Sequence, residues 1–242
     1  MEFNPLQICK DLYKIPRSIT GKGVVKSLKY LQNYVPLLIK KIPSGTNVFD
    51  WKIPPEWNID SAYIIDCSTN KKIVDIKDNS LHVIGYSEAV NIELKYSELC
   101  NHLHFLKDQP NAIPYITSYY SKNWGFCITY NQFKSLNKKS RYRVVINSEK
   151  NESGFLHYGE LIIKGKVKEE VFFSSYICHP QMVNNELSGP SLITSLASLI
   201  LKKKNHYTYR FVWIPETIGS IAYLSLNLEY LKSNVIGGFN VT

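Results

Sequence analysis

The chain has 242 residues, of which 44% are hydrophobic and 13% aromatic, enough to bury a core and to exclude an intrinsically disordered protein. Its formal charge of +9 comes mainly from scattered lysines, with only four arginines, so we do not expect nucleic acid as a partner. No apolar run reaches about 18 residues, so we do not expect a membrane partner either.

The first 34 residues are predicted to be helical. Apolar side chains recur there at helical spacing, and Ile15-Pro16 separates a first helix from a second one that runs from about residue 21 to residue 34. A strand is expected at residues 37–42. The proline-rich segment 46–57 then predicts an extended connector into an inserted module.

Residues 58–150 contain many short segments of strand character. Residues 62–67 and 72–76 flank Ser68-Thr69-Asn70, which predicts a hairpin. Other segments with the same character are 81–86, 90–94, 124–129 and 142–148. Short strands separated by turn residues favour a small barrel or sandwich for this module.

From about residue 152 the pattern changes to alternating strands and helices. The expected strands are 171–178, 207–214 and 235–241, and the expected helices begin near residues 188 and 218. This alternation predicts a parallel sheet with right-handed crossovers. Leu192, Ser195, Leu196 and Leu199 are predicted to form the inner face of the first of these helices.

The predicted fold class is therefore α/β with a β-rich insertion. The core is expected to comprise residues 1–50 and 152–242, and the inserted domain residues 55–148. No capping helix or closing strand follows the last predicted strand, so we expect a chain that is truncated at its C-terminus.

Polar residues follow two strands of the alternating region. His179 ends the first strand and is followed in the loop by Asn185 and Glu186, whereas Pro215-Glu216 ends the next strand. The carboxyl ends of neighbouring parallel strands meet in one crevice, so His179, Glu186 and Glu216 are expected to converge. Imidazole and carboxylate groups suit a divalent metal such as Zn²⁺, and a further carboxylate can act as general base.

Each of these residues also has a structural interpretation. A histidine at a strand end often makes only hydrogen bonds, asparagines often cap the following helix, and Glu216 lies where a helix dipole favours an acidic side chain. Tyr119, Tyr120 and Trp124 invite a role in substrate binding as an aromatic wall. More often such residues form the packed face of a domain, which is the interpretation we favour for the insertion.

Two sequence segments, CHPQMVNNELSG and WIPETIGSIAYLS, resemble a family of bacterial aminopeptidase-like proteins. These are relatives of the M28 aminopeptidases that carry an inserted β-rich domain and are linked to polysaccharide biosynthesis. Ser44–Ile59, Pro114–Cys127 and Gly154–Gly165 resemble the same family, so the resemblance covers nearly the whole chain. It implies an M28-like zinc exopeptidase core, a mostly parallel sheet flanked by helices.

The resemblance also implies roles for single residues. His179 matches the first metal ligand of the family, and the bridging aspartate of the loop NDNxSG falls at Asn185, with Glu186 one place later. The family's Glu-Glu pair is reduced to Pro215-Glu216. One Zn²⁺ held by His179 and Glu186 is therefore expected, with Asn185 at the bridging position and Glu216 as general base or third ligand. A second ion is not expected, because an amide is a weaker zinc ligand than a carboxylate.

The leading hypothesis is a metal-dependent aminopeptidase-like hydrolase that activates water to attack a small peptide or amide substrate. Two alternatives stay open: a non-catalytic binding or scaffold protein of polysaccharide biosynthesis on a peptidase fold, and a deacylase that acts on a sugar-linked amide. Five widely spaced cysteines without a Cys-x-x-Cys motif predict a reduced, cytoplasmic protein. Whether it forms oligomers is left open.

Overall fold

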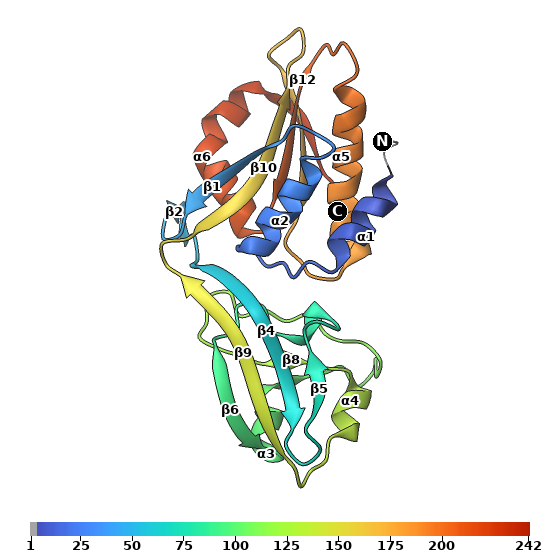
Figure 1. Ribbon diagram of the computed structural model, residues 1–242. Helices are drawn as coiled ribbons and strands as arrows, with labels where there is room; N and C mark the ends of the chain where they lie inside the picture. The colour runs from blue at the N-terminus through green and yellow to red at the C-terminus, as the bar shows by residue number, and fades with distance from the viewer. Residues whose placement is uncertain (1–3) are drawn as a thin grey trace. The chain divides into compact units, whose positions relative to one another are not determined.

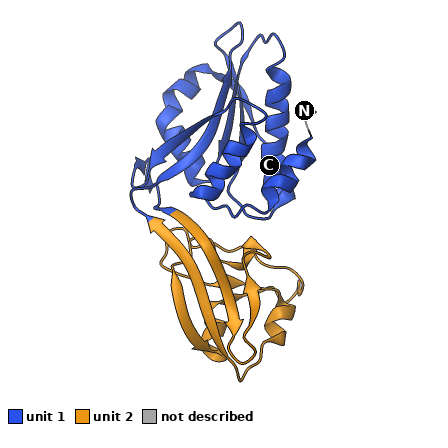
Figure 2. Ribbon diagram, in the orientation of Figure 1, with its two compact units in different colours: residues 1–56, 151–242 blue, residues 57–150 orange. Residues whose placement is uncertain are grey.

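The computed structural model describes residues 4–242, which divide into two compact units (Figures 1 and 2). Unit 1 consists of the chain up to Glu56 together with Asn151–Thr242, and unit 2 is Trp57–Lys150. Unit 2 is thus an insertion between two parts of unit 1. None of the helices formed by the described residues is long and apolar enough to cross a bilayer.

Unit 1 contains the alternating helices and strands expected from the sequence. Its elements are α1 (Pro5–Tyr13), α2 (Lys22–Leu31), β1 (Leu38–Pro43), β2 (Asn47–Val48), β3 (Trp51–Lys52), β10 (Phe155–Ile163), β11 (Glu170–Tyr176), η3 (Val183–Leu187), α5 (Ser188–Ile200), β12 (Thr208–Ile214), α6 (Ile218–Asn234) and β13 (Val235–Asn240). The first helix begins where the sequence predicts, because the Asn4 side chain accepts hydrogen bonds from the amides of Leu6 and Gln7 and Pro5 occupies the first turn.

The main sheet of unit 1 has five strands in the order β1-β10-β12-β11-β13. The last three strands in this order are parallel, as expected for strands joined by helical crossovers. By contrast, β10 runs antiparallel to both β1 and β12, so the sheet is mixed. The α/β fold class is confirmed. Because β11 and β12 are parallel neighbours, their carboxyl ends lie side by side.

Helices cover both faces of this sheet (Figure 1). One face packs with α1, α2 and α5 into a core that includes Leu12, Leu28 and Trp213, all fully buried. On α5 the predicted inner face is wrong for two of its four residues: Leu192 and Leu199 are more than half exposed, whereas Leu196 packs against this core. The side chains that α5 buries are Pro190, Ser191, Ile193, Thr194 and Ala197. This helix is apolar on nearly all sides, so its spacing of leucines did not identify the buried side.

The opposite face of the sheet carries a buried charged network under α6. Arg210 donates hydrogen bonds to both carboxylate oxygens of Glu170, at 2.6 and 3.1 Å, and to Glu160 at 2.7 Å. The hydroxyl groups of Tyr223 and Tyr230 on α6 donate to Glu160 and Glu170, each at 2.6 Å. The buried charges are therefore all hydrogen-bonded, as burial of ionised groups requires.

Unit 2 is built around an antiparallel sheet. Its elements are β4 (Glu56–Asp66), β5 (Lys71–Asp75), η1 (Ser80–His82), β6 (Val90–Lys95), α3 (Tyr96–Leu99), η2 (Cys100–His102), β7 (Leu103–His104), β8 (Phe126–Cys127), α4 (Tyr130–Ser135) and β9 (Arg141–Asn151). The hairpin predicted around residues 68–70 is confirmed as β4-β5. The predicted barrel or sandwich is not observed. The described strands of this unit form one four-stranded sheet, β5-β4-β9-β6, and a two-stranded parallel sheet, β7-β8. Residues 81–86 supply only the end of a short helical turn and two isolated bridges, one from Val83 to Phe126 of β8 and one from Gly85 to Thr117.

Candidate metal site

The candidate site lies where β11 and β12 end. The main-chain pairing of the two strands continues one residue beyond β11, because the amide of Ile177 donates to the carbonyl of Ile214 at 3.0 Å. Cys178 and His179 follow directly on one side, and Pro215-Glu216 on the other. Continued pairing thus carries the two polar loops to the same place at the sheet edge, where open α/β sheets hold their ligands.

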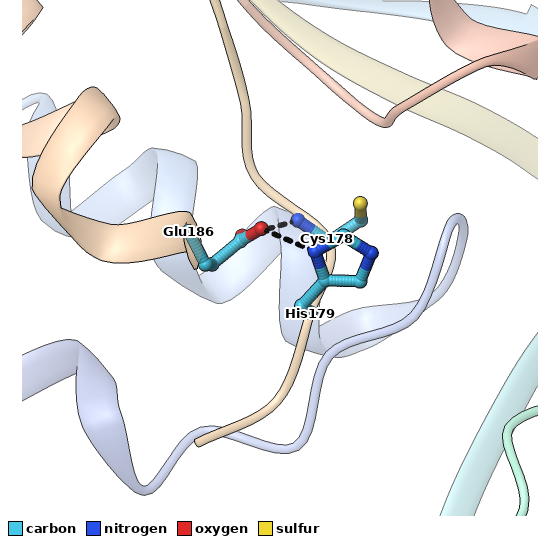
Figure 3. A group of neighbouring side chains, drawn as sticks. All are labelled: Cys178, His179 and Glu186. Atoms are coloured by element: carbon cyan, nitrogen blue, oxygen red, sulfur yellow. Dashed lines mark hydrogen bonds and ion pairs between the residues drawn. The ribbon is translucent and has the colours of Figure 1, made fainter. Parts of the chain in front are cut away.

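His179 lies between two carboxylates. Its Nε2 atom is 2.7 Å from Oε1 of Glu216, and its Nδ1 atom is 3.0 Å from Oε2 of Glu186. Figure 3 shows Glu186 reaching from η3 toward the imidazole and toward the main chain at Cys178. The structure therefore brings together the three side chains that the sequence predicted to converge.

The two carboxylates differ in their surroundings. The side chain of Glu186 is fully buried, and its Oε1 accepts a hydrogen bond from the amide of Cys178 at 2.5 Å. The side chain of Glu216 is 34% exposed. Consequently the Nδ1 side of the His179 ring is enclosed by protein, whereas its Nε2 side faces a carboxylate that solvent can reach.

Sequence reasoning missed Arg17, which lies in the segment between α1 and α2. Its side chain is fully buried, and its Nε lies 3.8 Å from Oε1 of Glu186. Nε and Nη2 both donate to the carbonyl of His179, at 3.1 and 2.8 Å. One signal was present: Arg17 is one of only four arginines in a lysine-rich chain.

The ionisation of the site follows from burial and from these carboxylates. Burial opposes a positive charge on His179, but its contacts with Glu186 and Glu216 outweigh burial and raise the pKa of the imidazole to about 9. Burial, reinforced by the charge of Glu186, raises the pKa of the Cys178 thiol well above its ordinary value. Without a metal the imidazole is therefore protonated at neutral pH and the thiol is neutral.

Unusual backbone conformations concentrate in the two loops. Gln181, Glu186 and Thr217 have φ angles of 46°, 150° and 50°. They are three of the six non-glycine residues with positive φ in the described part of the chain. Such conformations persist only where the surrounding structure enforces them, and they are common at functional sites. The loops therefore hold His179, Glu186 and Glu216 in a fixed arrangement.

Asn185 is not part of this cluster. Its side chain is exposed and accepts a hydrogen bond from the hydroxyl of Tyr176. The same hydroxyl lies 2.9 Å from Oγ1 of Thr242, and the Tyr176 ring stands edge-on to the His179 ring with centroids 5.4 Å apart. Asn185 is thus held next to the site through Tyr176.

The three aromatic residues predicted to bind substrate belong to unit 2. Tyr119 packs edge-on against Tyr86, with ring centroids 5.4 Å apart. Trp124 stacks on His102 at 3.6 Å, and Tyr120 is 56% exposed. Tyr119 and Trp124 thus pack on side chains of unit 2.

The donor set matches the chemistry of Zn²⁺, which binds imidazole nitrogen and carboxylate oxygen. Potential ligand atoms of Cys178, His179 and Glu186 lie within 4.8 Å of one another, and Glu216 adds a carboxylate on the Nε2 side. Cys178 is the least suitable of these, because zinc binds the thiolate and burial keeps this thiol protonated.

Comparisons with known proteins give the chain a family. A family model described as "Domain of unknown function (DUF4910)" matches residues 6–242. A Clostridium acetobutylicum protein, described as a presumptive polysaccharide biosynthesis protein with an aminopeptidase-like domain, is 45% identical over 230 residues. The match covers 95% of this chain and 52% of that protein, so the chain spans about half the length of this relative.

Solved structures show the same fold. The crystal structure of a presumptive peptidase from Clostridium acetobutylicum superposes with a TM-score of 0.94 at 44% identity, over 98% of this chain and 55% of that one. A zinc aminopeptidase from Bacillus subtilis gives a TM-score of 0.57 at 10% identity, over 98% of this chain and 69% of that one. An M28 peptidase precursor from Shewanella amazonensis gives a TM-score of 0.56 at 14% identity, over 96% of this chain and 69% of that one. The expected M28-like fold is confirmed.

Proposed function

Since this chain belongs to the DUF4910 family and has the fold of M28-type aminopeptidases, we propose that it contributes a zinc site to a hydrolase that cleaves a peptide or amide bond. The observation that supports this proposal is the arrangement Glu186–His179–Glu216, one imidazole between a buried and a partly exposed carboxylate. This chain spans about half the length of its Clostridium acetobutylicum relative, so the activity is proposed for a protein of that length.

His179, through Nε2, and Glu216 would hold the ion. The alternative position at Nδ1 is unfavourable, because the buried guanidinium of Arg17 lies 3.8 Å from Glu186 and would repel a dication there. Metal-binding histidines usually donate their other ring N–H to a carboxylate. Glu186 fits that role, and this proposal replaces the direct metal ligation expected for it from the sequence.

Zinc, when bound, polarises a carbonyl group and lowers the pKa of a coordinated water. The residues of this chain prepare the site for that chemistry. Oε2 of Glu186 lies 3.0 Å from Nδ1 of His179, so its charge favours the tautomer with the proton on Nδ1, which leaves the lone pair of Nε2 for the ion. Glu216 is the carboxylate on the exposed side of the ring, so it is also the group within this cluster that can receive a proton from a reacting molecule.

Metal content measured after dialysis against Zn²⁺ tests the proposal. We expect the wild-type chain to retain zinc and the variants His179→Ala and Glu216→Gln to lose it. Asn185→Ala is the matched control, since Asn185 lies in the same loop but contacts Tyr176, and it should retain zinc. Absence of zinc from the wild-type chain would refute the proposal.

The substrate class is tested separately on the full-length protein. We expect chelator-sensitive release of N-terminal residues from short peptides. Release of acyl groups from N-acylated sugars, without peptide cleavage, would instead support the deacylase alternative. Both reactions use the same metal chemistry on an amide carbonyl, so His179→Ala should abolish whichever is observed.

One observation favours a second candidate, a non-catalytic protein on the same fold. Each ring nitrogen of His179 faces a carboxylate, and these carboxylates favour a protonated ring, so in this candidate a proton would take the place of a metal. In that case zinc would neither bind nor raise the thermal stability of the chain, and no hydrolysis would be measured. The metal-content experiment therefore separates the two candidates.

A further inference from the structure

Arg17 is a buried arginine that connects the N-terminal helices to the candidate site. Neither its own side chain nor that of Glu186 is exposed at all. A guanidinium can be buried at acceptable free-energy cost only when its N–H groups find acceptors and its charge finds a counter-charge. Here the acceptors are main-chain carbonyls and the counter-charge is Glu186.

The hydrogen bonds of Arg17 fix the main chain of His179. Nε and Nη2 donate hydrogen bonds to the carbonyl of His179, at 3.1 and 2.8 Å, and Nη1 donates one to the carbonyl of Leu12 at 2.6 Å. The planar fork therefore joins the residue that carries the imidazole to the end of α1. A lysine, with one compact ammonium group, cannot reproduce this geometry.

The charge of Arg17 acts on Glu186. Oε1 of Glu186 faces Arg17 and the amide of Cys178, which leaves Oε2 directed at Nδ1 of His179. One oxygen of the carboxylate is therefore held by the Cys178 amide and the Arg17 charge, and the other lies 3.0 Å from the ring. This closes the Nδ1 side of the imidazole and directs Nε2 toward Glu216.

We propose that Arg17 is a positioning residue that fixes the main chain of His179 and the carboxylate of Glu186, so that the imidazole presents Nε2 to a metal. The inference rests on the proposed function, but it extends the site to a residue 162 positions earlier in the chain. Outer-shell partners of this kind typically change metal affinity by about 10- to 100-fold when removed.

The test compares the same substitution at two buried arginines of unit 1. Arg17→Lys is the test variant, and Arg210→Lys is the control, since Arg210 lies in the network under α6. Zinc affinity is measured by competition with a chromophoric chelator. We expect affinity to fall about 10-fold or more in Arg17→Lys and to stay within about 2-fold in Arg210→Lys. If circular dichroism shows that Arg17→Met is folded, its zinc affinity should fall at least as far as that of Arg17→Lys.

A second measurement needs no metal. Long-range ¹H–¹⁵N correlation spectra report the environment of both ring nitrogens of His179, assigned by loss of the signals in His179→Ala. We expect the Nδ1 signal of the wild-type chain and of Arg210→Lys to be that of a hydrogen-bonded N–H. In Arg17→Lys it should shift and exchange faster with solvent.

Each outcome decides the proposal about Arg17. Unchanged affinity in Arg17→Lys, or an equal loss in Arg210→Lys, overturns it. If the wild-type chain binds no zinc, the proposed function fails, and the ring spectra alone decide: a change confined to Arg17→Lys supports the positioning of His179, and identical spectra overturn it.

Discussion

His179 combines two environments in one ring. Sequence patterns predicted that this histidine would lie near Glu186 and Glu216, because all three follow the ends of adjacent parallel strands. They could not show which nitrogen faces which carboxylate, since ring orientation depends on side-chain rotamers and on burial. They also gave no reason to link Arg17 to the site, because that contact depends on how α1 and α2 pack on the sheet.

The raised pKa of His179 makes the stability of the metal-free chain depend on pH. The folded-state pKa of about 9 exceeds the ordinary value of 6.5, so the protonated ring stabilises the fold fully below about pH 6.5 and this contribution is lost as pH rises through 9. The loss is on the order of 3 kcal/mol. Urea unfolding between pH 6.5 and 9 should show this decrease in the free energy of unfolding in the wild-type chain. The decrease should be much smaller in His179→Gln. An equal slope in both would contradict the assignment.

Zinc binding should show the opposite pH dependence. A metal needs the neutral imidazole nitrogen, so binding to His179 must displace the proton that Glu186 and Glu216 stabilise. We expect apparent zinc affinity to increase as pH rises toward about 9, with proton release measurable by calorimetry in buffers of different ionisation enthalpy. Affinity independent of pH below this value would exclude His179 as a ligand.

At the scale of elements, α5 places the loop that carries Glu186. Gly189, in its first turn, packs so closely on the sheet edge that a Cβ there would lie 2.4 Å from Oγ of Ser175 and 2.5 Å from the carbonyl of Val241. Periodicity predicted this helix and its start correctly. It did not predict the close approach or the kinked turn before it, since both depend on tertiary contacts.

Gly189→Ala should therefore destabilise unit 1. We expect the free energy of unfolding to fall by about 1–3 kcal/mol, because the added methyl group meets main-chain and hydroxyl atoms that cannot move freely. Gly237→Ala is the control, since no atom lies within 4 Å of a Cβ at that position. Chemical denaturation of both variants measures the difference. Equal stabilities would show that the helix can shift at little cost.

At the scale of the molecule, the chain contains two units with separate sheets. The sequence showed the change from short strands to strand–helix alternation near residue 152. It did not predict the topology of the inserted unit, because segments 81–86 and 124–129 pair with residues far away in the sequence, such as Val83 with Phe126 and Leu103 with Phe126. The composition correctly excluded a disordered chain, since both units have buried hydrophobic residues.

Unit 1 should fold and bind zinc without unit 2. The strands that lead into and out of the insertion, β4 and β9, are neighbours in one sheet, and Oε2 of Glu56 accepts a hydrogen bond from the amide of Phe155 at 2.9 Å. Replacing residues 57–150 by an Asn-Gly turn should leave the circular dichroism of the α/β unit and its zinc content intact. The same deletion also tests substrate binding by the insertion. If Tyr119, Tyr120 and Trp124 contribute to that binding, a protein that lacks residues 57–150 should have a higher KM.

Anomalous diffraction at the zinc edge, from crystals of this chain soaked in Zn²⁺, tests the proposed metal site most directly. We expect a single peak between Nε2 of His179 and the carboxylate of Glu216, with ligand distances of about 2.0–2.2 Å. Glu186 should still lie next to Nδ1 and accept the hydrogen bond from the amide of Cys178. A peak on the Nδ1 side, bound by Glu186, or no peak at His179 would contradict the proposed site.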